Sequence, residues 1–152
     1  MTGRSEDPVN HAILPIFRYF LNAFLSPQTQ GWRLGFATAV GTWGDARGLA
    51  IANAAQNFIA AVLRGRPVPI SYHDPLNLDQ RTHTTTDEKE LLAIIKHMRN
   101  DDTAQARDAI SRLTHGQVKA NIVREGLVLA SHFQATGSLQ KLRKPITLRA
   151  VS

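Results

Sequence analysis

The stretch of this chain that looks most able to bind phosphate is residues 41–48, GTWGDARG, with three glycines, one acid and one base. Glycine-rich loops can hold phosphate through their backbone N–H groups. The spacing matches neither the Walker A loop, because Gly48 is followed by leucine, nor the dinucleotide fingerprint Gly-x-Gly-x-x-Gly. Gly44 and Gly48 are four residues apart, and we expect them to lie on one helix face, beside a helix cap at Asp45. There they would let a neighbouring helix approach closely.

Metal binding and covalent catalysis have no support in the residue spacing. The six histidines form no recognised metal-binding spacing such as His-Glu-x-x-His, so we predict no metal site and no cofactor. Cysteine and the Gly-x-Ser-x-Gly motif of nucleophilic serines are both missing from the sequence. The acids gather at expected helix starts, where capping accounts for them. We therefore predict that the chain is not an enzyme, and an enzyme of unknown class is only the third hypothesis.

Basic residues are the remaining candidates for a functional site. The net charge is +6 and the pI is near 10.3. The candidate phosphate-binding residues are those with few acids nearby in the sequence: Arg33, Arg47, Arg64 and Arg66, opposed only by Asp45, and Lys141, Arg143, Lys144 and Arg149 in the last 16 residues. Arginine predominates, and its planar fork suits phosphate oxygens. The alternative is an ordinary solvated face.

Sequence-specific DNA reading is disfavoured by the one segment that could form a helix–turn–helix, residues 103–134. Aligning Gly116 with the glycine of the turn puts Arg112 where a small buried residue is needed. The same alignment puts Glu125 at a buried apolar position. We therefore expect contacts to backbone phosphates, which require positive charge and reach but no base readout.

An apolar helix should open the chain. Asp7 and Pro8 are typical of a helix start, and Pro27 discourages continuation beyond about Ser26. Polar residues occupy only a narrow face of this segment, so we expect a single chain to leave part of it exposed. The residues predicted to serve helix packing and assembly are Ile13, Phe17, Phe20, Phe24, Gly44 and Gly48.

The other elements follow from capping signals and helical periodicity. We expect two helices in residues 31–64, and a long proline-containing loop at about 65–85. Thr85 and Glu88 fit a capping box that starts a helix ending near Arg99. Two more helices should follow, one capped by Asp101 or Asp102 and stopped by Gly116, the other at about 117–134. The predicted fold is an all-α, bundle-like single domain of five or six helices over residues 1–152, with an N-terminal arm (1–30), a helical core (31–136) and a basic tail (137–152).

The favoured function is a structural, self-assembling protein that binds nucleic acid through backbone phosphates without sequence preference. A coat, capsid or packaging protein fits this description, with a helical filament as one form of assembly. The alternative is a soluble helical interaction or regulatory module that uses the apolar first helix. The expected partners are further copies of the chain and nucleic acid. The apolar run at 12–25 is too short to span a bilayer and the first residues make a poor signal peptide, so we expect a cytoplasmic or virion location.

Overall fold

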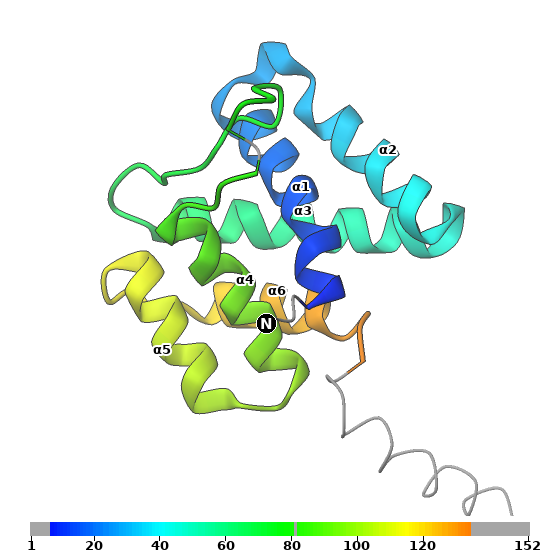
Figure 1. Ribbon diagram of the computed structural model, residues 1–152. Coiled ribbons are helices and arrows are strands. Elements are labelled where there is room, and N and C mark those ends of the chain that lie inside the picture. The colour runs from blue at the N-terminus through cyan, green and yellow to red at the C-terminus, as the bar shows by residue number, and fades with distance from the viewer. Residues whose placement is uncertain (1–6, 81, 135–152) are drawn as a thin grey trace, which may run out of the picture.

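The chain folds into α-helices (Figure 1). The computed structural model describes residues 7–80 and 82–134, and this part of the chain has six α-helices, one short 3₁₀ helix and no β-strand. The helices are α1 (Pro8–Leu25), α2 (Gly31–Trp43), α3 (Asp45–Gly65), α4 (Thr86–Arg99), α5 (Thr103–Thr114) and α6 (Ala120–Ala130), and the 3₁₀ helix η1 (Pro27–Thr29) joins α1 to α2. The all-α, bundle-like fold expected from the sequence is confirmed.

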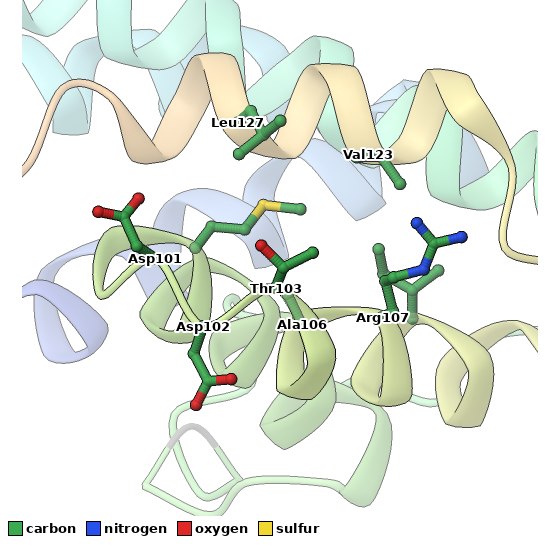
Figure 2. Close-up of a pocket in the computed structure, with 9 residues that line it drawn as sticks. Asp101, Asp102, Thr103, Ala106, Arg107, Val123 and Leu127 are labelled. Carbon is green, nitrogen blue, oxygen red and sulfur yellow. The ribbon is translucent and has the colours of Figure 1, made fainter.

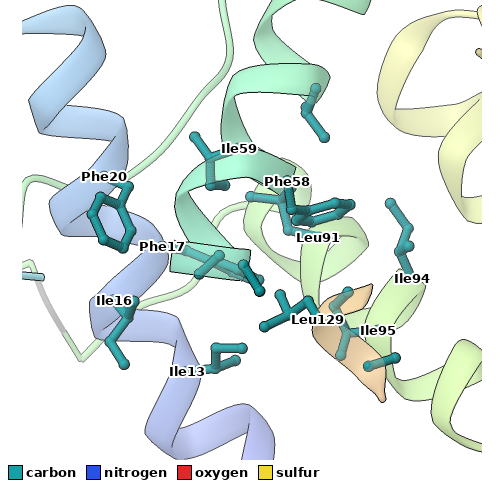
Figure 3. Close-up of a cluster of buried hydrophobic side chains, with 14 of the residues drawn as sticks. Ile13, Ile16, Phe17, Phe20, Phe58, Ile59, Leu91, Ile94, Ile95 and Leu129 are labelled. Carbon is teal, nitrogen blue, oxygen red and sulfur yellow. The ribbon is translucent and has the colours of Figure 1, made fainter. Parts of the chain in front are cut away.

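One hydrophobic core joins the helices. α2 packs against α1 and α3, α5 packs against α4, and α6 packs against α3 and α4. Figure 3 shows the centre of this core, where Phe17 of α1 and Phe58 of α3 lie near Leu91 of α4 and Leu129 of α6. The ring centroids of Phe17 and Phe58 are 5.8 Å apart. Side chains from the first and last described helices therefore stabilise the same core.

Most of the first helix is covered by its own chain, and the apolar part that stays exposed is confined to its end. Ile13, Phe17 and Phe20 are fully buried, and the exposed large hydrophobic side chains of α1 are Phe24 (41% exposed) and Leu25 (49% exposed) at its end. The narrow polar face is buried as well, because the loop before α4 lies over Arg18 and Asn22. These contacts lie far apart in sequence, so the periodicity of α1 alone could not reveal them.

Local capping signals place the helix starts as the sequence predicts. An Asp7 carboxylate oxygen accepts a hydrogen bond from the Val9 N–H at 3.0 Å. Thr85 and Glu88 form both bonds of the capping box, at 3.0 and 2.9 Å. Asp102, rather than Asp101, caps α5. Each of these carboxylate or hydroxyl groups satisfies a backbone N–H that the helix itself leaves unpaired.

The last helix is shorter than predicted. α6 begins at Ala120 and ends at Ala130, whereas the sequence pattern favoured about 117–134. Lys119 has the extended conformation of an N-cap residue. The carbonyl of Gln117 accepts a hydrogen bond from the hydroxyl of Thr114, which holds residue 117 in the turn after α5. A side-chain contact across a turn therefore overrides the helical period.

The glycine-rich stretch is the junction of α2 and α3. Gly44 has a φ of 88° and a ψ of 172°, a conformation nearly restricted to glycine, and it stands at the N-cap position of α3. Asp45 is the first residue of α3, so its expected role as the cap is wrong. Gly48 lies against α2: a Cβ built there would be 2.6 Å from the carbonyl oxygen of Ala39 and from the Cα of Val40. The close helix approach therefore depends on Gly48, while Gly44 provides the turn.

Two contacts at Arg99 bring the ends of the described fold together. The Arg99 guanidinium forms a salt bridge with Asp7 at 2.8 Å and donates a hydrogen bond from Nε to the carbonyl of Gln134 at 3.0 Å. Asp7 caps α1, and Gln134 is the last described residue. The first and last described residues thus meet at the end of α4.

Candidate functional site

Charge is distributed unevenly along the chain. The described residues contain 12 Lys and Arg against 11 Asp and Glu, so most of the net charge of +6 comes from segments 1–6, 81 and 135–152. Within the described residues, Asp45 is the only acid between positions 8 and 65, a range that contains four arginines. Arg18 is buried and paired with Glu88, so Arg33, Arg47 and Arg64 are the arginines of the first three helices whose positive charge could attract a polyanion.

Two of these arginines lie beside exposed aromatic rings, at the end of the molecule where α1 stops and α2 begins. Arg64 lines a shallow pocket together with Phe24 and Leu25 of α1. The first residue of α2 packs against the backbone of α1 near Ala23, so the residues that follow it lie at this same end. We name Phe24, Trp32, Arg33 and Arg64 the arginine–aromatic surface.

Exposure distinguishes this surface from the rest of the fold. Trp32, near the start of α2, is 56% exposed. α2 buries its small residues Gly31, Gly35 and Ala39 and leaves larger side chains outside. The sequence carries no signal that distinguishes an exposed tryptophan from a buried one. Arg33 and Arg64 are exposed, and neither forms an ion pair within the described part of the chain.

Arg47 is separated from the other two and has a structural contact. It lies at the start of α3, beyond the end of α2 and about 25 Å from Arg64 along α3, from a rise of about 1.5 Å per residue. Its guanidinium donates to the carbonyl of His132 at 2.9 Å and lies 5.8 Å from the centroid of the Phe133 ring. The structure therefore does not place Arg47 with the arginine–aromatic surface.

Arg66, also predicted to bind phosphate, is engaged within the fold, which disfavours that role. Its side chain is only 7% exposed and forms a salt bridge with Asp87 at 3.0 Å. It also donates hydrogen bonds to the carbonyls of Val68, Pro69 and Leu113. All of its donor capacity is directed at the base of the loop between α3 and α4. The other predicted residues, Lys141, Arg143, Lys144 and Arg149, lie outside the described residues.

A buried ion pair fixes that loop to α1. The Glu88 carboxylate accepts two hydrogen bonds from Arg18, at 2.7 and 2.9 Å, and one each from the backbone N–H groups of His73 and Thr85. Burial alone would raise the pKa of Glu88, but the hydrogen bonds from Arg18, His73 and Thr85 outweigh it and hold that pKa below its usual value. Glu88 is therefore an ionised anchor and no proton donor. Sequence reasoning found its capping role but missed Arg18, which is 70 residues away.

A second polar contact lies beside this pair. The Tyr72 hydroxyl donates to the Asn22 side-chain oxygen at 2.6 Å, and the Asn22 amide donates to Asp74 at 3.0 Å. Burial, together with the negative charge of Asp74, raises the pKa of Tyr72. Each of these groups already has a protein partner, so we interpret the cluster as the attachment of the loop rather than as a reaction centre.

The part of the chain that the structure describes contains no set of side chains arranged to bind a metal ion. No group of three or more histidine, aspartate or glutamate side chains is close enough there to hold an ion. The rings of His73 and His83 come nearest to one another, with centroids 6.3 Å apart. None of the described helices has the length and apolar character required to cross a bilayer.

An apolar groove lies between α5 and α6 (Figure 2). Met98 of α4, with Ala106 and Ile110 of α5, forms one side of it, and Val123 and Leu127 of α6 form the other. Leu127 is 51% exposed. α5 and α6 both pack against α4 but are not among the helix pairs in extensive contact with each other, which leaves the groove open.

The comparisons with known proteins supply no relative for this chain. No protein-family model matches it, and neither a curated protein nor a solved structure does so. The residues and their geometry are therefore the basis for any statement about function.

Proposed function

We propose that this chain is a structural, self-assembling protein that binds nucleic acid without sequence preference, of the coat, capsid or packaging type. One observation carries the nucleic-acid part of this proposal: exposed aromatic rings, Phe24 and Trp32, and arginines without an ion pair lie at the end of the described fold where α1 stops and α2 begins. A cytoplasmic or virion location and a filament as the assembled form belong to the same proposal.

The physical chemistry of the surface favours single strands. Unpaired bases stack on exposed aromatic side chains irrespective of their identity, and each stacked base contributes about 1–3 kcal/mol. Trp32 and Phe24 offer such rings, at 56% and 41% exposure. Arg33 and Arg64 would contact the phosphates between those bases, with Asp45 as the only acid in the first three helices.

The C-terminal segment adds to the attraction. Residues 137–152 contain Lys141, Arg143, Lys144 and Arg149 and no acid. Nonspecific binding depends mainly on the number of phosphates neutralised, so these four charges would strengthen it for any sequence. The interaction-module hypothesis based on α1 has less support, because only Phe24 and Leu25 of that helix are substantially exposed.

Binding can be measured by fluorescence anisotropy with labelled single-stranded and duplex oligonucleotides of mixed sequence. We expect affinity for single strands that falls steeply between about 50 and 200 mM salt and does not depend on sequence. Arg33→Gln and Arg64→Gln should each reduce the slope of log affinity against log salt by about 0.7, the value for one single-strand phosphate contact. Binding should also quench tryptophan fluorescence, and Trp32→Leu should remove most of the quenching.

Arg112→Gln is the matched control. Arg112 is also an exposed helical arginine, with a side chain 54% accessible, but it pairs with Glu90 in the part of the fold where acids are frequent. Its substitution should leave the salt slope unchanged. The nucleic-acid proposal is wrong if the wild-type chain shows no binding at about 50 mM salt. It is also wrong if Arg112→Gln weakens binding as much as Arg33→Gln and Arg64→Gln do.

A further inference from the structure

α6 is apolar on nearly every side but is covered on only one. Its sequence, ANIVREGLVLA, has three polar residues, Asn121, Arg124 and Glu125. Ile122, Gly126, Leu129 and Ala130 are buried against α3 and α4. Leu127 and Val128 remain 51% and 45% exposed on the outer side. A helix with this composition is normally buried all round, so the outer side of α6 lacks a partner.

The uncovered side of α6 continues into the groove between α5 and α6. Beyond Val123 and Leu127, the same hollow extends along α6 past Val118, Ala120 and Val128. The surface is thus an apolar strip along the outer side of one helix, with an adjoining groove.

Charges at the two ends of the groove have opposite signs. Asp101 lies at one end and Arg107 lies at the other, as Figure 2 shows. Asp102 also lines the groove, but its side chain points away from α6 and caps α5. Arg124 lines the hollow on the side of Arg107, near the start of α6. Neither Asp101 nor Arg107 forms an ion pair within residues 7–80 and 82–134. The groove therefore presents an acidic end, an apolar middle and a basic end.

We propose that this surface binds the same surface of a second copy of the chain, around a two-fold axis. In a two-fold contact the same patch is used twice, and each residue meets its counterpart in reverse order. Two α6 helices lying antiparallel would bring the acidic end of each groove to the basic end of the other. Leu127 and Val128 of both copies would then meet in the apolar middle.

Other occupants fit the charges less well. A basic segment, such as residues 137–152 of the same chain with four bases and no acid, matches Asp101 but places positive charge against Arg107. A uniformly acidic partner would match Arg107 but would place negative charge against Asp101. An occupant with both charges in the right order is required, and the chain's own surface supplies it. The inference rests on the self-assembly part of the proposed function and identifies the surface that performs it.

Analytical ultracentrifugation of the full chain without nucleic acid tests the proposal. The wild-type chain should change from about 16.8 kDa towards twice that mass as its concentration rises. Leu127→Gln should weaken the association about tenfold or more, because it removes a central apolar side chain. Leu49→Gln is the matched control: Leu49 is 49% exposed on α3, so the same change there should leave the association unchanged.

Charge variants test the two-fold arrangement. Arg107→Glu puts an acid beside Arg124 at the basic end of the groove and should weaken the association, whereas Lys89→Glu, on the exposed side of α4, should not. Circular dichroism should show that all variants are folded, since every substituted side chain is exposed. A chain that stays monomeric at every concentration would overturn both this inference and the self-assembly part of the proposed function. Association that Leu127→Gln leaves unaffected would overturn the inference alone.

Discussion

Three glycines of the 41–48 stretch occupy three different environments, so the same substitution with alanine should change stability in three different ways. Gly41 lies in the last turn of α2, and a Cβ added there meets no atom within 4 Å. Gly44 is equally open, but its φ of 88° and ψ of 172° are accessible almost only to glycine. Gly48 is helical, and its added Cβ would lie 2.6 Å from backbone atoms of α2.

The expected magnitudes follow from these environments. Gly41→Ala should increase the free energy of unfolding by about 0.5–1 kcal/mol, because alanine loses less backbone entropy on helix formation. Gly44→Ala should decrease it by roughly 1–3 kcal/mol through backbone strain. Gly48→Ala gains up to about 1 kcal/mol of helix propensity but forces α2 and α3 apart at a rigid backbone contact. Overpacking costs about 1–3 kcal/mol and is worst against backbone, so we expect a net loss of roughly 1–2 kcal/mol.

Urea denaturation followed by far-ultraviolet circular dichroism measures all three values on one scale. The order of stability should be Gly41→Ala, then wild type, then the other two variants. If Gly48→Ala proves as stable as Gly41→Ala, the inference that α2 and α3 approach too closely at Gly48 to admit a Cβ is wrong. If Gly44→Ala is neutral, the junction does not require its left-handed conformation.

Three further predictions concern the polar contacts. Glu88→Gln should lower the free energy of unfolding by about 3–5 kcal/mol, because Arg18 would remain buried without its counter-charge. Arg112 pairs with Glu90 at the surface, so Arg112→Gln should change the free energy of unfolding by less than about 1 kcal/mol. Equal losses for the two variants in urea denaturation would contradict the burial argument. The folded-state pKa of Glu88 lies below 4.5, so its stabilisation is present above that pH and is lost as the pH falls through the folded-state pKa. The stability difference between wild type and Glu88→Gln should therefore shrink on acidification. A difference that does not vary with pH would contradict the lowered pKa of Glu88. Asp102→Ala should cost about 1 kcal/mol in thermal or urea unfolding through loss of the α5 cap, and a neutral result would show that the cap does not contribute.

Features determined by neighbouring residues could be predicted from the sequence. Asp7, the Thr85–Glu88 capping box and the acid before α5 act on N–H groups two or three residues away, so residue type and spacing are sufficient. The all-α fold follows from the same local signals combined with helical periodicity.

Features determined by distant contacts could not be predicted. Arg18 reads as part of a solvent-facing strip, because its partner Glu88 is 70 residues further along the chain. The sequence also gives no sign that Arg66 is engaged, because its partners, Asp87 and the carbonyl of Leu113, lie far along the chain. Leu127 has the period of a core residue, but its burial depends on whether α5 closes over it. Periodicity shows which residues share a helix face, whereas the packing of other helices decides which faces are covered.

The Arg99 contacts have a consequence for how the chain could be reconnected. Because Asp7 and Gln134 are held by one side chain, a short linker could join them without crossing the fold. A circular permutant opened in the exposed turn around residues 76–79 would keep every helix and the Arg18–Glu88 pair intact. The two points at which the described fold begins and ends are therefore neighbours, although they are separated by nearly the whole described sequence.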